Sequence, residues 1–203
     1  MAKKKNNMKT WLIIGGIVIV LLILIFWFVG TYNNFVKLDH TVDAKWANVE
    51  SNYQRRFDLI PNIVSTVEGA VKFEKGTQTE IAAIRTGMAN AKTAYGKADT
   101  LEEKMAAMTE SDVVAKRFAG LNINVENYPQ LKATENFLSL QDELSGTENR
   151  INVARIDYND ATKNYNIAIH RIPAKFIASI TGFEGKDLFK AKEGAADPVK
   201  VEF

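Results

Sequence analysis

Cysteine is absent from the 203-residue chain, and histidine and proline are scarce, with two and four copies. The lack of cysteine excludes disulfides, cysteine-based zinc sites, thiol nucleophiles and lipid attachment through an N-terminal cysteine. His40 and His170 are too few for a multi-histidine metal site, and no H-E-x-x-H spacing accompanies them. We therefore predict a protein that uses neither a metal ion nor another cofactor.

The charge is distributed unevenly along the chain. Residues 1–10 contain four lysines and no acid, and residues 11–30 contain no charge at all. Of the 26 basic residues in total, 22 therefore lie in residues 31–203, together with all 24 acidic residues, for a net charge of −2. A nearly balanced domain without a basic stripe or a recognition motif argues against nucleic acid as a partner.

Residues 11–30 form one uncharged and mostly aliphatic run. A helix of this length spans a hydrocarbon core of ~30 Å, because each residue adds ~1.5 Å. A secretory signal peptide has a shorter apolar core and a small-x-small cleavage site, but bulky residues stand here instead. Trp11, Trp27 and Tyr32 lie at the two ends, where interfacial aromatic residues are enriched. We predict an uncleaved single-pass anchor that contacts the lipid bilayer through residues 11–30.

Lysines flank this run unequally. Four lie within the ten residues before it, whereas only Lys37 and Lys45 lie in the twenty residues after it. The positive-inside rule then places residues 1–10 in the cytoplasm and residues 31–203 on the outer side of a cell membrane.

Apolar residues recur with a helical period after residue 32. Their spacing averages about 3.6 residues, which predicts one amphipathic helix through Phe35, Leu38, Val42, Trp46, Val49, Tyr53, Phe57 and Ile60. Pro61 then interrupts the stripe. Because proline disfavours helical geometry in the residue before it, we predict a tight helix–helix turn at Asp58–Ile60. A kinked but continuous helix is the alternative.

Two more helices are predicted in the middle of the chain. The second carries a stripe over residues 63–95, and a loop follows at residues 96–100. The third covers residues 101–125 and ends at the Asn127-Tyr128-Pro129 break. Thr100 and Glu103 have the spacing of a capping box for its start.

The fourth helix is predicted to be the longest and to end at Pro173. Its heptad stripe consists of Leu131, Leu138, Leu144, Ile151, Tyr158, Tyr165 and Ile172. Small residues fill much of the adjacent seam, and Gly146 costs roughly 1 kcal/mol relative to alanine inside a helix. We therefore predict a tight helix crossing at Gly146. A short helix up to Ile180, a stop at Gly182 and a tail follow.

Four long helices with short links bury their stripes best against one another. The predicted fold is all-α, with an N-terminal transmembrane helix followed by an antiparallel up-and-down four-helix bundle. The predicted divisions are a basic cytoplasmic N-terminus at 1–10, the transmembrane helix at 11–30, the bundle at 31–180 and a C-terminal tail at 181–203.

Three stretches have the character of sequence motifs: Tyr53-Gln54-Arg55-Arg56-Phe57-Asp58-Leu59-Ile60-Pro61-Asn62-Ile63-Val64, Tyr128-Pro129-Gln130-Leu131-Lys132-Ala133 and the run from Leu144 to Asn159. They resemble signatures of the LemA family. The resemblance covers nearly the whole chain and implies a bacterial, membrane-anchored protein with a four-helix bundle. No catalytic activity is established for the family as a whole, so the resemblance implies a fold but no reaction.

Two groups of charged residues, at the end of the first long helix and in the fourth, are candidate site residues. They are Arg55, Arg56, Asp58, Glu148, Arg150, Arg155 and Asp157. They form either a functional polar cluster or ion pairs that set helix register, and the second interpretation is favoured. Tyr158 and Tyr165, seven residues apart, are expected to face one seam, where a tyrosine presents an apolar ring with a polar tip.

Three functions remain open. The favoured hypothesis is a non-enzymatic, membrane-anchored interaction or scaffold module for an unknown protein partner. The second is a structural homo-oligomer paired through the fourth helix. The third, an enzyme with an unrecognised carboxylate site, lacks any visible nucleophile–base pair or metal cluster.

Overall fold

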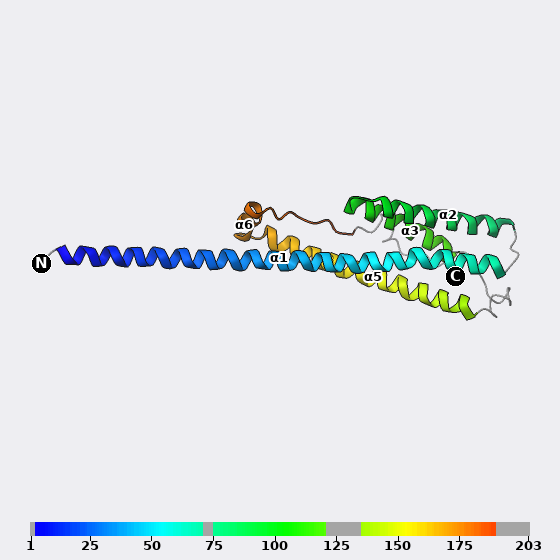
Figure 1. Ribbon diagram of the computed structural model, residues 1–203, viewed down its shortest axis with the longest axis horizontal. Helices are drawn as coiled ribbons and strands as arrows, with labels where there is room; N and C mark the ends of the chain where they lie inside the picture. The colour runs from blue at the N-terminus through cyan, green and yellow to red at the C-terminus, as the bar shows by residue number, and fades with distance from the viewer. Residues whose placement is uncertain (1–2, 71–74, 121–134, 190–203) are drawn as a thin grey trace, which may run out of the picture. The chain divides into compact units, whose positions relative to one another are not determined.

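The computed structural model describes residues 3–70, 75–120 and 135–189, with side chains at 9–68, 77–120 and 137–189. Within these ranges the chain is helical and contains no strand, which confirms the all-α prediction. The helices, drawn in Figure 1, are α1 (Lys3–Ala70), α2 (Lys75–Lys97), α3 (Leu101–Gly120), α5 (Glu135–His170) and α6 (Ala174–Thr181).

The chain forms two compact units. The first consists of Met1–Lys45 and Asn159–Leu188, and the second of Trp46–Tyr158 and Phe189–Phe203. Because α1 and α5 are long, each contributes one part to the first unit and another part to the second.

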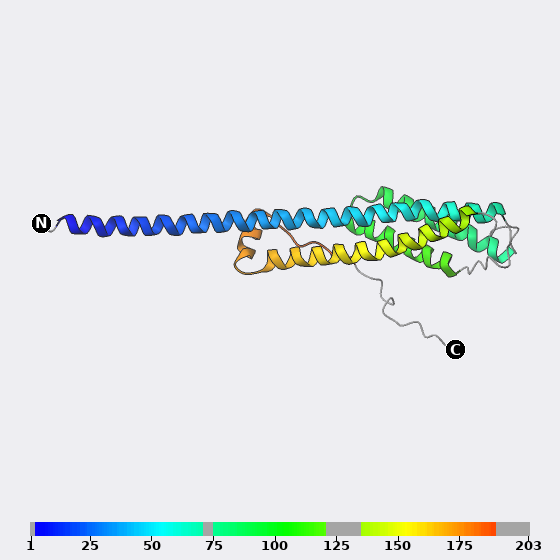
Figure 2. The same cartoon turned by 90° about the horizontal axis from the view of Figure 1, so that it is seen from below.

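The second unit, which we call the bundle unit, is an antiparallel up-and-down bundle of α1, α2, α3 and α5 (Figure 2). The contacts between α1 and α2 show that these helices are antiparallel. Glu50 contacts Tyr95, whereas Asp58, later on α1, contacts Lys92, which is earlier on α2. Its core contains apolar side chains from all four helices, including Val49, Phe57, Ile60, Ile81, Ile84, Met88, Met108, Phe137 and Ile151. The predicted bundle architecture is thus confirmed.

Helix α1 continues through Pro61, so the predicted turn at Asp58–Ile60 is wrong. A proline inside a helix removes one backbone hydrogen bond and costs about 3 kcal/mol or more. The apolar stripe continues past it, and Ile60, Ile63 and Val67 are all at most 1% exposed. Each such burial contributes about 1.5–3 kcal/mol, which offsets the cost of the proline. Residues 63–70, predicted to begin the second helix, therefore belong to α1.

The capping box at the start of α3 is confirmed. The backbone N–H of Glu103 donates to Thr100 Oγ1 at 3.2 Å, and the backbone N–H of Thr100 donates to Glu103 Oε2 at 3.1 Å. Hydrogen bonds from the backbone N–H groups of Thr100 and Asp99 lower the pKa of the Glu103 carboxyl. The helix is described as far as Gly120, and the predicted break at Asn127-Tyr128-Pro129 lies outside the described residues.

The predicted end of the fourth helix and the short helix after it are also confirmed. Helix α5 ends at His170, and α6 ends at Thr181 with Gly182 as its C-cap, whose φ of 77° is left-handed. Glycine adopts this conformation without a Cβ clash, and the N–H of Phe183 returns to the carbonyl of Ala178 at 3.1 Å. Leu131, at the predicted start of the fourth helix, lies outside the described residues.

The predicted tight crossing at Gly146 is wrong. A Cβ placed there would meet only Arg150 Nη1, one turn along the same helix, at 3.3 Å. The close approach occurs instead between α2 and α3, where a Cβ on Gly87 would lie 2.9 Å from Val114 Cγ2. A glycine marks a tight crossing only where a neighbouring helix lies directly against it. The spacing of glycines in the sequence does not show which of them has such a neighbour.

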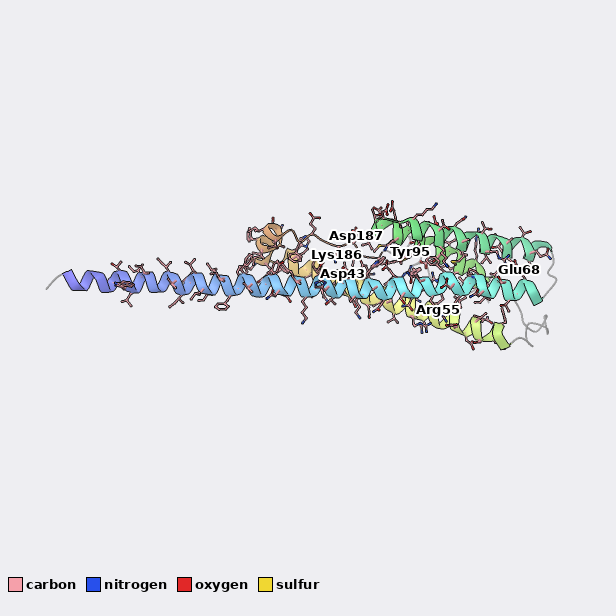
Figure 3. All side chains as sticks on the ribbon, in the orientation of Figure 1. Asp43, Arg55, Glu68, Tyr95, Lys186 and Asp187 are labelled. Atoms are coloured by element: carbon pink, nitrogen blue, oxygen red, sulfur yellow. The ribbon has the colours of Figure 1, made fainter. Side chains whose placement is uncertain are left out.

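The first unit packs the segment after α6 against α1 and α5. Phe183 contacts Tyr32 and Phe35 edge to face, with ring centroids 5.7 and 5.4 Å apart. Lys186 Nζ lies 2.7 Å from an Asp39 carboxylate oxygen and 2.6 Å from one of Asp43, and Figure 3 labels the second pair. Burial lowers the pKa of Lys186, but its hydrogen bonds to these two carboxylates raise it by more.

One described helix, α1, is long and apolar enough to cross a membrane. Its apolar 18-residue window has a mean hydropathy of 3.3, and none of that window is buried. Every large apolar side chain from Trp11 to Val29 is at least 38% exposed.

The Gly87→Ala variant should be less stable than the natural protein by about 1 kcal/mol. Overpacking against Val114 costs about 1–3 kcal/mol, whereas alanine gains up to about 1 kcal/mol of helix propensity. The measurement is urea unfolding of the full chain in detergent, followed by far-UV circular dichroism. Gly96→Ala is the matched control on α2, because a Cβ there meets nothing within 4 Å. If both variants gained stability equally, the α2–α3 approach would not be tight.

Candidate functional site

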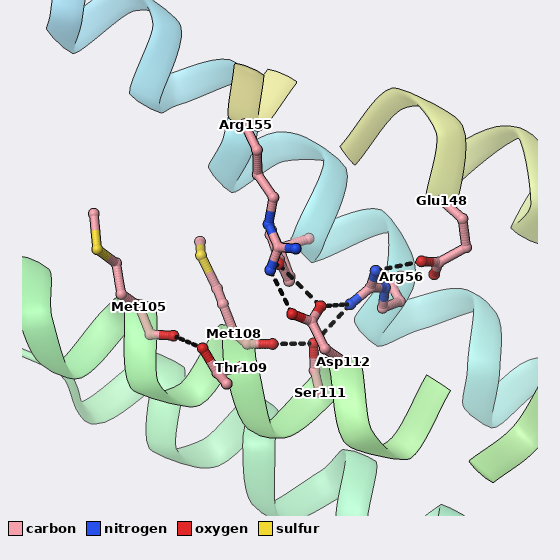
Figure 4. A network of polar contacts seen from close by, with 9 residues as sticks. Arg56, Met105, Met108, Thr109, Ser111, Asp112, Glu148 and Arg155 are labelled. Atoms are coloured by element: carbon pink, nitrogen blue, oxygen red, sulfur yellow. Dashed lines mark hydrogen bonds and ion pairs between the residues drawn. The ribbon is translucent and has the colours of Figure 1, made fainter. Parts of the chain in front are cut away.

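A buried arginine joins three helices of the bundle unit (Figure 4). The Arg56 side chain, on α1, is 2% exposed. Its Nη1 donates to Asp112 Oδ1 at 2.5 Å and to Ser111 Oγ at 3.2 Å on α3. Its Nη2 donates to Glu148 Oε2 on α5 at 2.5 Å. The planar guanidinium of Arg56 thus donates hydrogen bonds to acceptors on two neighbouring helices.

A second arginine reaches the same aspartate from α5. Arg155 Nη2 forms an ion pair with Asp112 Oδ2 and donates to the hydroxyl of Tyr53. The Tyr53 hydroxyl in turn donates to Asp112 Oδ1 at 3.0 Å. Both guanidinium groups lie over the Tyr53 ring, with Arg56 Cζ at 4.8 Å and Arg155 Cζ at 5.4 Å from its centroid. Asp112 is therefore the common acceptor of what we call the Arg56 network: Tyr53, Arg56, Ser111, Asp112, Glu148 and Arg155.

Burial and charge act in opposite directions on Arg56. Burial lowers the pKa of its guanidinium, but Glu148 and Asp112 raise it by more, so the group stays protonated. Burial raises the pKa of the Tyr53 phenol, and the negative charge of Asp112 raises it further. Tyr53 is therefore a neutral donor at physiological pH, and Arg56 is a permanent cation.

A cavity of about 670 Å³ borders the network between α1, α3 and α5. It is lined by Arg56, Asp112, Glu148 and Arg155 of the network, by further polar residues such as Gln141 and Asn152, and by apolar ones such as Val113, Phe118 and Leu144. Among the described residues, the buried atoms Arg56 Nε, Arg155 Nε and Glu148 Oε1 have no hydrogen-bond partner. Two donors and one acceptor thus remain unused inside the network.

The structure brings only some of the predicted charged residues together. Arg56, Glu148 and Arg155 meet in the network, whereas exposed Arg55 pairs separately with Glu143 on α5. Figure 3 labels Arg55 on α1.

The other charged candidates lie outside the network. Asp58 pairs with Lys92 of α2 at 2.8 Å, and both side chains are more than half exposed. Arg150 donates to Thr147 of its own helix at 2.8 Å. Asp157 lies on α5 and is half-buried. The contacts of Asp58 and Arg150 are therefore separate from the network.

The two tyrosines of the heptad stripe are both buried but belong to different units. Tyr158 packs on Trp46 in the bundle unit, with ring centroids 5.2 Å apart. Tyr165, in the first unit, donates its hydroxyl to the Glu184 carbonyl at 2.8 Å. Burial, followed by the nearby charge of Asp39, raises the pKa of Tyr165.

Sequence reasoning missed Tyr53, Ser111 and Asp112 as members of the network. A signal for the last two is present, because the apolar stripe of the third helix skips from Met108 to Val114. One turn after Met108, the core-facing positions are polar, so a buried polar contact could have been inferred there.

The described residues offer no metal site. In the ranges where side chains are described, no three histidine, aspartate or glutamate residues cluster in a way that could bind a metal ion. The two carboxylates of the network are instead paired with arginines.

Comparison with known proteins identifies the family. The model of the LemA family matches residues 45–203. The chain belongs to the LemA family. Two magnetosome proteins of Paramagnetospirillum magneticum, MamQ 1 and MamQ 2, are each 27% identical over 184 residues, covering 83% of this chain and 68% of theirs. Protein LemA of Metamycoplasma hominis is 25% identical over 168 residues, covering 83% of this chain and 73% of its own. This LemA-family chain thus matches its relatives over most of its length.

Replacing Asp112 with asparagine should destabilise the bundle by about 3 kcal/mol. The change keeps the side-chain shape but leaves two arginines without their shared counter-charge, and breaking a buried pair costs about 3–5 kcal/mol. Urea unfolding of the full chain in detergent measures the loss. Asp58→Asn, which breaks the exposed pair with Lys92, is the control and should cost less than about 1 kcal/mol. Equal losses in the two variants would show that the network is worth no more than a surface ion pair.

Proposed function

We propose that this LemA-family protein is a non-enzymatic, membrane-anchored helical module that presents its bundle to a protein partner at the cell envelope. The observation that carries the proposal is the exposed apolar run of α1. Its large side chains from Trp11 to Val29 are 38–75% exposed, although later residues of the same helix are closely packed. Water disfavours a contiguous apolar surface of this extent, whereas a bilayer solvates it.

The proposed topology follows from the flanking charges. Residues 1–10, with four lysines, remain in the cytoplasm, and residues 11–30 cross the membrane once. The bundle assigned to residues 31–180 and the tail at 181–203 then lie outside. Anchoring raises the effective concentration of the bundle toward any partner confined to the same membrane surface.

The Arg56 network supports a structural role for the charged candidates. Arg56 finds both of its carboxylate partners only in one alignment of α1, α3 and α5, and a shifted helix would leave a buried charge unpaired. We therefore assign helix register to this network and to the surrounding charges. The enzyme alternative is less supported, because arginines engage Asp112 and Glu148 and leave neither as a free general base.

A homo-oligomer through α5 is the second candidate. It is favoured by Val153 and Ile156, which are 57% and 61% exposed on one face of α5. It is disfavoured because Leu144, Ile151 and Tyr158 of the heptad stripe are buried within the bundle unit of the same chain. A dimer would have to form through other positions of α5, where Leu138, Val153, Ile156 and Ile167 are the exposed large apolar side chains among the described residues.

The double variant Leu21→Arg/Leu24→Arg should leave the membrane fraction. Each arginine at the centre of a spanning helix costs about 2.5–3.5 kcal/mol on insertion scales. The measurement is cell fractionation with an alkaline carbonate wash and detection of the full chain. Val153→Arg/Ile156→Arg is the matched control, since it adds the same charges to exposed apolar positions of the bundle unit. If the Leu21→Arg/Leu24→Arg chain stayed in washed membranes, residues 11–30 would not be the anchor.

The variant Ile156→Cys should give no disulfide-linked dimer in membranes under oxidising conditions. The natural chain has no cysteine, so any dimer must form through the introduced thiol. The readout is non-reducing electrophoresis, with Ser51→Cys, an exposed position on α1, as the control. A dimer seen with Ile156→Cys and not with the control would favour the homo-oligomer over the interaction module.

A further inference from the structure

Helix α6 exposes an apolar face in the first unit. Ile172, Phe176 and Ile180 follow one another at steps of four and are 75%, 66% and 79% exposed. Phe176 and Ile180 are four apart on α6 and therefore lie on one side of it, and together with Ile172, which precedes the helix, they make up what we call the α6 face. Ile177 and Ala178 point the other way and are 3% exposed. The helix is therefore apolar on its inner side and also on part of its outer side.

The α6 face lies at the end of the apolar run of α1. One cavity of about 410 Å³ is lined jointly by Trp27, Gly30 and Thr31 of α1 and by Arg171, Ile172 and Pro173 before α6. Figures 1 and 2 both show α6, in brown, beside α1. Trp27 and Gly30 are at the end of the proposed membrane span, so α6 begins at the same level.

The segment after α6 is attached to this part of α1 as well. Phe183 packs on Tyr32 and Phe35, with centroid distances of 5.7 and 5.4 Å. Contacts before and after α6 thus keep the helix next to residues 27–35.

The charges around the α6 face suit a lipid surface. Arg171 and Lys175 are exposed and adjoin the apolar stripe, and the exposed acid Glu184 lies beyond the turn at Gly182. An apolar face bordered by basic side chains is typical of helices that lie in the membrane interface, where the cations meet anionic headgroups.

We propose that α6 is an interfacial helix, with Ile172, Phe176 and Ile180 inserted at the boundary between lipid headgroups and acyl chains. The proposal rests on the membrane span of α1, because the α6 face is continuous with the end of that span. Insertion of α6 gives the first unit a second lipid contact. Both α1 and the end of α5 are then held at the membrane surface. A protein partner or a second copy could cover an apolar face too, but continuity with the apolar run favours lipid.

The test uses nitroxide labels on single cysteines, which the cysteine-free chain allows. Phe176→Cys and Ile180→Cys report on the α6 face, and each replaces a side chain that is already exposed. Leu21→Cys reports on the span, and Ile156→Cys, 61% exposed on α5, is the matched control. Each full-length chain is reconstituted in vesicles of phosphatidylcholine and phosphatidylglycerol. Power saturation then compares collisions with oxygen, which concentrates in lipid, and with a water-soluble nickel chelate.

The expected result is a several-fold lower collision rate with the nickel chelate, and a higher one with oxygen, at positions 176 and 180 than at position 156. If position 21 is in lipid but positions 176 and 180 match position 156, the α6 proposal is overturned and the anchor stands. If position 21 is also in water, the anchor itself is refuted and the α6 proposal with it. Labels at 176 and 180 that are shielded from both reagents would identify a protein cover and also overturn the proposal.

Discussion

The geometry of the bundle unit depends on satisfying the charge of Arg56. A guanidinium that is 2% exposed has lost nearly all of its hydration, and such a loss is tolerated only when charged and polar partners replace the water. Asp112 and Glu148 do so from two different helices, and Arg155 and Tyr53 complete the coordination of Asp112. Apolar packing tolerates many helix rotations, but this set of hydrogen bonds forms at one rotation and one register.

Helix α1 has two kinds of apolar surface that require different surroundings. From Trp11 to Val29 the large side chains are exposed all around the helix, whereas Tyr53, Phe57 and Ile60 are buried on one stripe. The same secondary structure therefore suits a hydrocarbon environment in one part and a protein core in another. The α6 face adds a third case, a one-sided apolar stripe bordered by cations, which suits the boundary between lipid and water.

Local signals in the sequence predicted local structure well. The apolar run, the helical period after residue 32, the Thr100–Glu103 box and the Gly182 stop all depend on neighbours within a few residues, and all are found in the structure. Pro61 shows the limit of such signals. Its helix-breaking tendency is local, but the burial of Ile63 and Val67 on the far side of it outweighs that tendency and is decided by the other helices.

By itself, the sequence determined the fold class, the candidate span and the approximate helices, because periodicity and hydropathy are properties of consecutive residues. The tertiary structure alone decided that Gly87 and not Gly146 is at a tight crossing, and that Arg56 and Arg155 share Asp112 while Asp58 pairs elsewhere. Those contacts join residues 27 to 56 positions apart along the chain. Which of them form depends on helix rotation and pairing, and these are set by the packing of all four helices together.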